Sequence, residues 1–589
     1  MGSVFFQAEE AARTAVAPAI KSLRIGIGPV PVREAAEGFG DLACPVAFAA
    51  AKQLRELGKS PAEIASEICI RANREPLPEW FEKIDSAGGF VNFWFSERFF
   101  EKAAAEAASL GKKFGQTDEF RGKTAVVDYS CPNVGKPLHV GHLRSTIYGD
   151  AAKKLLAATG YKAVGFNYLG DAGRQVAEIV VAVRHFKDLP EIRDEKGLLD
   201  YYVKIKKAVG ENPALEKEVR EAMESIEAGD EKVVAEVARI REMSFGAFER
   251  TYKVLGIGFD ETSGESDFMK PAKAVVDEAL SKGAAETAKT GEVVALLEKK
   301  GLPNTLLRRS NGTTLYFTRD LALADYKWKK YGFDLSFYAT AAEQNLHFRQ
   351  VFAFLALLGR PFAEKCAHVG FGLVTLPEGK MSTRLGRVVL LEDVLNEAVG
   401  AARKEVESRL GQIEERTGKK YSGKELDGIA RGVGIGSLKF AVLRVSPERE
   451  IGFDFKKMVS FDGDTGAYLQ YTFVRAASIL RKAAGKEAGK AVGREESSGA
   501  SWMDEEKRVV KKIAAYPRVV SDAAKSFRPH VLCDYLLGLA ADFSAFYEKC
   551  PVLRAGGPAR RRRLEIVKAV ENVLGGGLGL LGMAAPEKM

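Results

Sequence analysis

The period of the hydrophobic positions changes twice within one stretch of the first third of the chain. Thr124–Tyr129 is a short β-branched, apolar run, which predicts a buried strand. A helix is expected to begin near His139 and end at Gly160, because apolar residues recur there at every fourth position. A second strand is predicted at Ala163–Leu169. Strand, helix and strand in this order form one βαβ unit and predict a parallel α/β sheet.

The pattern becomes helical and highly charged from about 189 to 300, where Leu215–Phe245 is one long amphipathic stretch. We interpret this region as a helical insertion into the α/β domain. Strand signals and one apolar helix then resume, at Thr314–Phe317 (strand), Leu335–Tyr338 (strand), Phe348–Leu358 (helix) and Cys366–Val374 (strand). The α/β domain with its insertion is therefore predicted to span 119–395.

The segment before this domain mixes helix and strand signals. Ser60–Glu63 has the form of a capping box with proline at the first helical position. Gly88–Phe95 is a turn followed by an alternating strand. These signals predict a small α+β domain at 1–118.

From Glu392 onward the pattern is almost wholly helical. It predicts a helical linker at 396–454 and an all-helical domain at 455–589. Lys482–Ser501 is rich in Ala, Gly, Lys and Glu and is expected to be an exposed loop.

Composition narrows the class of protein. The chain has 589 residues, 46% hydrophobic and 28% charged, which excludes a largely disordered, collagen-like or disulfide-scaffold protein. Its six cysteines contain no C-x-x-C pair, which argues against a structural metal and for a reducing cytoplasm. No apolar run reaches the ~20 residues of a spanning helix, and no secretion signal is visible, so we expect no membrane contact.

Positive charge is concentrated at the C-terminal end. The net charge is +9, and Phe455–Met589 holds 23 Lys and Arg against 15 Asp and Glu. A basic segment on a balanced body suggests docking of a polyanion. A solvated basic surface explains the charge alone equally well.

The most specific motif follows the first predicted strand. In Ser130–His142, two histidines flank Gly141 at the start of the predicted helix. Free backbone N–H groups at a helix start favour phosphate, and glycine lets a nucleotide approach the backbone. His139 and His142 lie three residues apart, on one helical face, where both could donate to a polyphosphate.

A second motif lies about 240 residues further on. Gly379–Arg387 is a glycine-bounded cationic loop, in which Lys380 and Arg384 could neutralise the charge of a leaving pyrophosphate. Taken alone, this segment would be an ordinary basic turn.

Together the two motifs resemble the nucleotide-binding signatures of class I aminoacyl-tRNA synthetases. His139–His142 matches His-Ile-Gly-His with Val140 in the second place, and the loop matches Lys-Met-Ser at the start of Lys-Met-Ser-Lys-Ser. Further segments over almost the whole chain resemble arginyl-tRNA synthetases: Asn167–Asp171, Tyr316–Leu321, Gln344–Phe348, Ser460–Gly466, Tyr468–Tyr471 and Leu580–Met589.

Two departures from that family's pattern stand out. Thr383 occupies the place of the second lysine of the loop signature, and Lys136, just before the first signature, fits a substitution known in arginyl enzymes. Ala172 and Arg174 stand where the family often has an aromatic and a threonine-like residue.

The resemblance implies a Rossmann-like catalytic domain that uses ATP with Mg²⁺ to attach L-arginine to tRNA(Arg), in a cytoplasmic monomer without a structural metal. The first domain would contact the tRNA elbow, 396–454 the tRNA stem, and the last domain the anticodon. The implied catalytic residues are Lys136, His139, His142 and Lys380. The implied ATP contacts are His139, Gly141, His142, Lys380, Met381 and Ser382. The implied arginine contacts are Asp128, Asn133, Tyr316, Asp320 and Gln344, and the tRNA contacts are Tyr468, Tyr471, Arg475 and Arg481.

The chemistry of the residue types agrees, because a guanidinium is bound best by carboxylates. Tyr316 and Asp320 face one way only if their stretch is helical or turns into a helix. Three alternatives remain open: another class I synthetase, a nucleotidylyltransferase of the same superfamily, and an RNA-binding protein that has lost catalysis.

Overall fold

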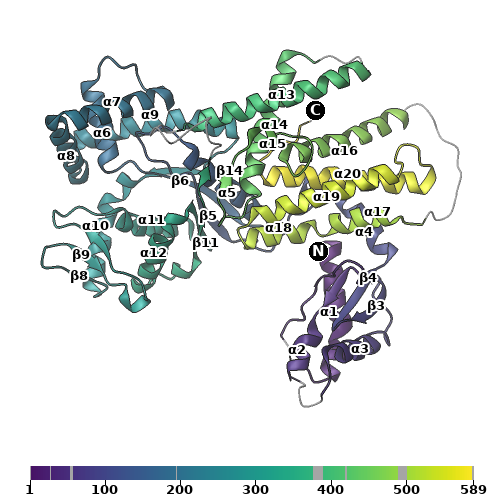
Figure 1. Cartoon of the computed structure of the whole chain (residues 1–589). Coiled ribbons are helices and arrows are strands. Elements are labelled where there is room, and N and C mark those ends of the chain that lie inside the picture. Colours follow the sequence, from purple (N-terminus) through teal and green to yellow (C-terminus); the bar gives the residue numbers. More distant parts are fainter. Residues whose placement is uncertain are drawn as a thin grey trace.

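The computed structural model has an α/β body with a C-terminal bundle of helices beside it, and a small N-terminal domain that lies next to the bundle (Figure 1). It describes residues 2–26, 28–53, 58–193, 195–375, 389–417, 421–487 and 501–586.

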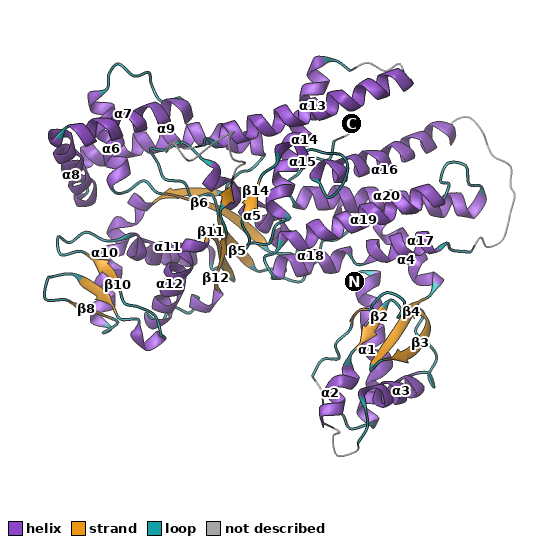
Figure 2. Ribbon diagram, viewed as in Figure 1, coloured by secondary structure: helices purple, strands orange, loops and turns teal. Residues whose placement is uncertain are grey.

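The body is built on a five-stranded parallel sheet with the strand order β12-β11-β5-β6-β7 (Figure 2). Its strands are β5 (Thr124–Asp128), β6 (Lys162–Leu169), β7 (Glu261–Gly264), β11 (Leu335–Ala341) and β12 (Cys366–Phe371). The predicted parallel sheet is confirmed. From β5 the chain builds outward to β6 on one side and later to β11 on the other. Such a reversal of strand order opens a crevice at the carboxyl ends of the strands.

Side chains of β5 alternate between two hydrophobic layers. Ala125 and Val127 belong to the layer that contains α5 (Val140–Ala158), whereas Val126 belongs to the opposite layer. The helices of the opposite layer are α10 (Met269–Ser281), α11 (Tyr316–Tyr331) and α12 (Asn345–Leu357). Both faces of the sheet are thus covered, as a parallel sheet requires.

Helix α5 approaches the end of β5 very closely at Gly149. A Cβ at this position would lie 2.0 Å from Cβ of Tyr129, whose ring is fully buried. We therefore expect Gly149→Ala to lower the free energy of unfolding by about 1–3 kcal/mol through overpacking. Gly400→Ala is the control, since nothing lies within 4 Å of that position. Thermal unfolding should show a lower midpoint for Gly149→Ala only, and equal midpoints would contradict the close packing.

The N-terminal domain is α+β, as predicted, with an antiparallel sheet in the order β1-β2-β4-β3. Its elements are α1 (Val4–Ser22), β1 (Arg33–Glu34), β2 (Leu42–Cys44), α2 (Val46–Gln53), α3 (Pro61–Ala72), β3 (Phe81–Ala87) and β4 (Phe90–Phe95). The predicted capping box is present, with the Ser60 hydroxyl accepting from the N–H of Glu63. Helix α4 (Glu97–Leu110) then leads out of the domain, followed by the turn η2 (Gly111–Lys113).

The predicted helical insertion is only partly helical. Helix α6 (Arg174–His185) precedes it, and the insertion itself starts with three helices: α7 (Glu195–Glu211), α8 (Pro213–Ala228) and α9 (Glu231–Leu255). The long amphipathic stretch is broken because Gly229 ends α8 in a left-handed conformation and Asp230 caps α9. The chain then returns to the main sheet through β7, a strand too short to show an alternating pattern. A small antiparallel sheet follows α10, formed by β8 (Ala285–Thr287), β9 (Val293–Ala295) and β10 (Thr305–Arg308).

The strand predicted at Thr314–Phe317 is wrong, because α11 already begins at Tyr316. Only Thr314 makes an isolated bridge, to Arg308. The aromatic residues that resembled a strand form the first turn of a helix instead. The helical alternative left open for Tyr316 and Asp320 is therefore the correct one.

The C-terminal part is almost wholly helical, as predicted, apart from β14 (Ile451–Gly452), which forms a short parallel pair with β13 (Val374–Thr375) of the preceding domain. Its helices are α13 (Leu391–Thr417), α14 (Gly423–Leu443), α15 (Phe455–Met458), α16 (Gly466–Glu487), α17 (Asp504–Ala514), α18 (Tyr516–Lys525), α19 (Pro529–Lys549) and α20 (Gly557–Leu580). The first part of the predicted loop Lys482–Ser501 is helical, since α16 continues to Glu487; residues 488–500 lie outside the described ranges. Helix α5 also packs against α14, α18, α19 and α20.

Among the described residues, no helix is long and apolar enough to cross a membrane. The predicted bounds of the four domains stay predictions.

Candidate active site

A cavity of about 520 Å³ opens at the carboxyl ends of the central strands. Its walls include Asp128 at the end of β5, Gly170 just after β6, and Tyr338 and Thr340 on β11. It thus lies where the strand order reverses, which is where parallel α/β sheets bind ligands. Seven of the predicted site residues line it: Asp128, Asn133, Gly141, His142, Tyr316, Asp320 and Gln344.

The two signature histidines cap the first turn of α5. The N–H of Gly141 donates to Nδ1 of His139, and the N–H of His139 donates to Nδ1 of His142, both at 3.1 Å. Because each Nδ1 accepts a hydrogen bond, the hydrogen of a neutral ring resides on Nε2. Each histidine can therefore donate from Nε2. Gly141 is needed for this arrangement, since a Cβ there would lie 2.8 Å from Cε1 of His139.

Both histidines are neutral at physiological pH. Burial, together with the repulsion that a protonated His139 would exert, lowers the pKa of His142 to about 3. Burial also lowers the pKa of His139, and Lys136 adds to the effect on both rings. Lys136 itself is half-buried, with Nζ 5.5 Å from the ring centre of Tyr202, and does not line the cavity.

The chain on both sides of the second motif, Gly379–Arg387, is hydrogen-bonded to residues of α5. The N–H of Val140 donates to the Val389 carbonyl at 3.1 Å. The buried guanidinium of Arg144 donates to the carbonyls of Gly372, Ser446 and Arg449. The predicted contacts Lys380, Met381 and Ser382, together with Arg384, lie outside the described residues.

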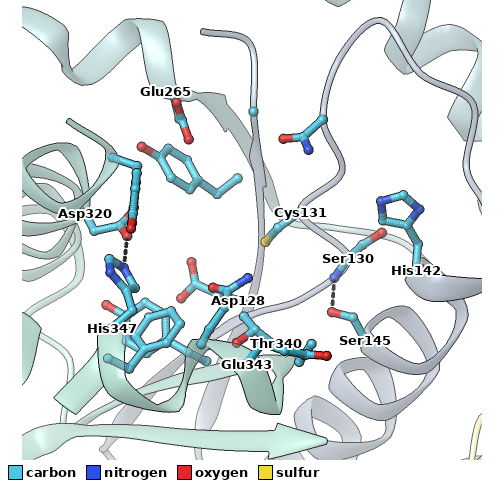
Figure 3. A pocket seen from close by; sticks show the side chains of 18 of the residues that line it. Asp128, Ser130, Cys131, His142, Ser145, Glu265, Asp320, Thr340, Glu343 and His347 are labelled. Atoms are coloured by element: carbon cyan, nitrogen blue, oxygen red, sulfur yellow. Dashed lines mark hydrogen bonds and ion pairs between the residues drawn. The ribbon is translucent and has the colours of Figure 1, made fainter. Parts of the chain in front are cut away.

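The opposite wall of the cavity is acidic (Figure 3). Oδ2 of Asp320 lies 2.6 Å from Nε2 of His347. Tyr316, one helical turn earlier on α11, is 58% exposed, and its ring centre lies 5.0 Å from that of His347. In Figure 3, Asp320, His347 and Glu265 lie on one side and His142 lies on the other.

Glu265 is a site residue that the sequence analysis missed. It follows β7 in the turn η3 (Glu265–Phe268), inside the region predicted to be helical. Burial raises its pKa to about 7, although Arg319, which donates to Oε2 at 3.0 Å, opposes the shift. His347 was also missed as a site residue, although it stands in the segment Gln344–Phe348 that carried the family resemblance.

Asp128 is paired within the protein. Nζ of the fully buried Lys327 donates to its Oδ2 at 2.6 Å and lies 3.9 Å from the ring centre of Tyr338. Burial raises the pKa of Asp128 to about 6, against the attraction of Lys327. Oδ1 of Asp128 has no hydrogen-bond partner among the described residues, so one acceptor remains at the cavity wall.

Asn133 is exposed and lines the cavity beside Gly170. The two residues form an isolated parallel bridge, and a Cβ on Gly170 would lie 2.1 Å from Oδ1 of Asn133. The chain reaches this position through Ser130 and Cys131, which both adopt left-handed backbone conformations, with φ of 69° and 48°. Strain of this kind persists where the surrounding structure over-determines the backbone.

Arg174, which stands where the family often has a threonine-like residue, makes ion pairs that explain its presence. Its guanidinium pairs with both carboxylate oxygens of Glu216 at 2.8 and 2.6 Å and with Glu178 at 2.9 Å. It therefore ties α6 to α8. Nothing in the structure explains Ala172.

The predicted tRNA contacts lie on α16, apart from the cavity. The Tyr468 hydroxyl lies 3.2 Å from the Ser544 hydroxyl, and Arg475 stacks 4.2 Å over the ring of Tyr547. Tyr471 and Arg481 are exposed.

Comparisons with known proteins cover nearly the whole chain. Residues 106–455 match the family model of the catalytic domain of class I (R) tRNA synthetases. Residues 469–589 match the DALR anticodon binding domain, and residues 10–95 match the arginyl tRNA synthetase N-terminal domain.

Individual relatives agree. The arginine–tRNA ligase of Clostridium perfringens (strain 13 / Type A) is 36% identical over 555 residues, which is 94% of each chain. That of Clostridium botulinum (strain Loch Maree / Type A3) is 37% identical with the same coverage. The structure of Thermus thermophilus arginyl-tRNA synthetase superposes with a TM-score of 0.79 at 29% identity, over 98% of this chain and 100% of that one. With matches of this extent to all three regions, the chain belongs to the arginyl-tRNA synthetase family.

Proposed function

We propose that this enzyme activates L-arginine with ATP and transfers it to the 3′-terminal adenosine of tRNA(Arg), releasing AMP and pyrophosphate. The observation that carries the proposal is one cavity with an acidic wall on one side and, on the other, the start of α5 with the neutral His142; His139 caps the same helix just outside the lining. The acidic wall suits a cationic side chain, and the helix start suits phosphate. The family and the names of the relatives support the same reaction.

Arginine would lie across the cavity. Asp320 and Glu265 would hold the guanidinium, and the hydroxyl of Tyr316 would add a hydrogen bond. Asn133, Gln344 and Oδ1 of Asp128 would bind the α-amino and α-carboxylate groups. This orientation points the carboxylate toward His142, so the nucleophile of the first step faces the site proposed for ATP.

The reaction needs no protein nucleophile. A carboxylate oxygen of arginine attacks the α-phosphorus of ATP, the bond to the bridging oxygen breaks, and pyrophosphate leaves. The 2′-hydroxyl of the terminal adenosine then attacks the arginyl carbonyl carbon and AMP leaves with the bonding electrons. Nε2–H of His139 and of His142, with Lys136 and Lys380, would stabilise the charge that develops on the phosphates.

We place Mg²⁺ with ATP, as part of the substrate. Within the described ranges, no group of three or more His, Cys, Asp and Glu side chains could hold a metal ion. For the transfer step we propose that Tyr468, Tyr471, Arg475 and Arg481 contact the tRNA, and that the enzyme acts as a cytoplasmic monomer.

The decisive experiment is attachment of labelled arginine to total tRNA in the presence of ATP. Lysine, glutamine and citrulline are tested alongside. We expect charging with arginine alone. Charging with another amino acid would overturn the roles of Asp320 and Glu265, and tRNA binding without charging would favour an RNA-binding protein without catalysis.

Arginine binding should weaken on acidification. Glu265 has a pKa of about 7, so its carboxylate is largely ionised at pH 8 and largely protonated at pH 6. The Kd for arginine, measured by calorimetry, should therefore rise by up to about 10-fold between these pH values. Glu265→Gln should bind weakly throughout, with a flatter pH dependence. A wild-type Kd that stays constant from pH 8 to pH 6 would remove Glu265 from the guanidinium site.

A further inference from the structure

Charged groups from α5 and α14 converge on the turn that follows α20. Lys439 on α14 is 1% exposed, and its Nζ donates to the carbonyl of Gly582 at 2.7 Å. Asp150 on α5 is also buried and accepts from Lys154 one turn later. Burial lowers the pKa of Lys439 to about 8, Asp150 opposes this shift, and Lys154 adds to it. These residues form the tail junction: Asp150, Lys154, Lys439 and Gly582.

Gly582 is shaped for this junction. Its φ of +67° is in the left-handed region, two residues after the end of α20, and the N–H of Met583 donates back to the Leu578 carbonyl. A Cβ on Gly582 would lie 2.9 Å from Oδ2 of Asp150 and from Nζ of Lys154, and 3.0 Å from Nζ of Lys439. The charged groups therefore pack directly on the backbone of the tail, and a side chain at this position would have to displace them.

A second tie holds the next residues. Gln470 on α16 is fully buried, and its Nε2 donates to the carbonyls of Gly432 and Ala584. Gly466 at the start of α16 packs against Met583, because a Cβ there would lie 2.9 Å from Cε of Met583. Residues 582–584 are thus held by α5, α14 and α16 together.

The junction lies on the helix that carries the signature histidines. Asp150 follows His142 by eight residues, which is about 12 Å along the axis of α5. A helix packed on both sides moves as one body, so a shift of the tail would shift His142. On the other side, Gln470 connects the tail to α16, the helix that contains the proposed tRNA contacts.

We propose that Lys439 and Gly582 are positioning residues for aminoacylation, which set the placement of α5 according to the docking of the C-terminal helices on tRNA. This inference rests on the proposed function. A buried charged contact contributes little net stability compared with an apolar substitute, but its direction is specific. Lys439→Met removes the hydrogen bond to the Gly582 carbonyl but leaves Asp150 paired with Lys154. We therefore expect the fold to be kept and the fixed placement of the tail on α5 to be lost.

The test uses the full chain with Lys439→Met, and Lys424→Met at an exposed position of α14 as control. Lys439→Met should lower kcat of tRNA charging by about 3- to 30-fold. The Kd values of ATP and arginine without tRNA, and the thermal midpoint, should stay near wild type. A structural role alone would lower the midpoint or weaken ATP and arginine binding as much as charging.

Gly582→Ala perturbs the same junction from the side of the tail, because its Cβ would displace the charged groups packed on Gly582. It should reproduce the loss in kcat, whereas Gly579→Ala, where nothing lies within 4 Å, should charge like wild type. If both Lys439→Met and Gly582→Ala charge tRNA at the wild-type rate, the inference is overturned while the proposed function stands. If the wild-type chain charges no arginine, the proposed function itself fails.

Discussion

Replacing His142 with alanine should lower kcat of arginine charging by about 10²–10³-fold, the usual effect of losing one donor to a charged transition state. Nδ1 of His142 accepts from the His139 N–H, so Nε2 is left as the donor toward the cavity. The low pKa keeps the ring neutral, and the donor is therefore present across the physiological pH range. The Kd for arginine should change little, because the arginine contacts lie on the other wall.

Two further variants separate catalysis from folding. His142→Ala also removes a cap of α5, which alone costs about 1 kcal/mol of stability. His142→Asn keeps an acceptor for the cap and loses the Nε2 donor, so its kcat should fall as well. His185→Ala, at an exposed histidine paired with Glu218, should charge at the wild-type rate. If His142→Asn retained most of the activity, the His142 ring would serve only to cap α5, and its role as a donor to the phosphates would be excluded.

The sequence predicted those elements that have a long, regular pattern. The strands β5 and β6 and the helix between them follow from buried apolar periodicity, because both faces of the sheet are covered. Strands β7, β8, β9 and β10 have three or four residues each, which is too few for an alternating signal. The β-propensity of Tyr316 and Phe317 misplaced a strand there. In the structure these two residues are helical, and they pack against His347 and Phe354 of α12.

Some residues of the candidate site could also be predicted from the local sequence, and others could not. His139, Gly141 and His142 are contiguous, so their roles can be predicted from local spacing. Glu265 lies in a turn after a short strand, and only the folded sheet brings it to the cavity wall that contains Asp320. Lys327 lies in the middle of a helix, and only the folded sheet brings it to Asp128. Nothing local to either residue indicates a binding site.

Asp320 should have the largest effect on substrate affinity. Asp320→Asn keeps the shape of the side chain and removes its charge from a position that is only 19% exposed. Removing one partner of a buried charged pair costs about 2–5 kcal/mol, or roughly 30- to 4,000-fold in kcat/KM for arginine. Steady-state charging with varied arginine would measure this loss, and KM for ATP should change much less.

The selectivity of the same variant tests whether charge is the cause. Citrulline has the outline of arginine without its positive charge, so it gains nothing from the carboxylate of Asp320. The ratio of kcat/KM for arginine over citrulline should therefore fall in Asp320→Asn, mainly through the loss for arginine. Asp427→Asn, at an exposed carboxylate paired with Arg403, should leave the ratio unchanged. An equal loss for ATP and arginine would instead indicate that Asp320 acts through His347 on the shape of the cavity.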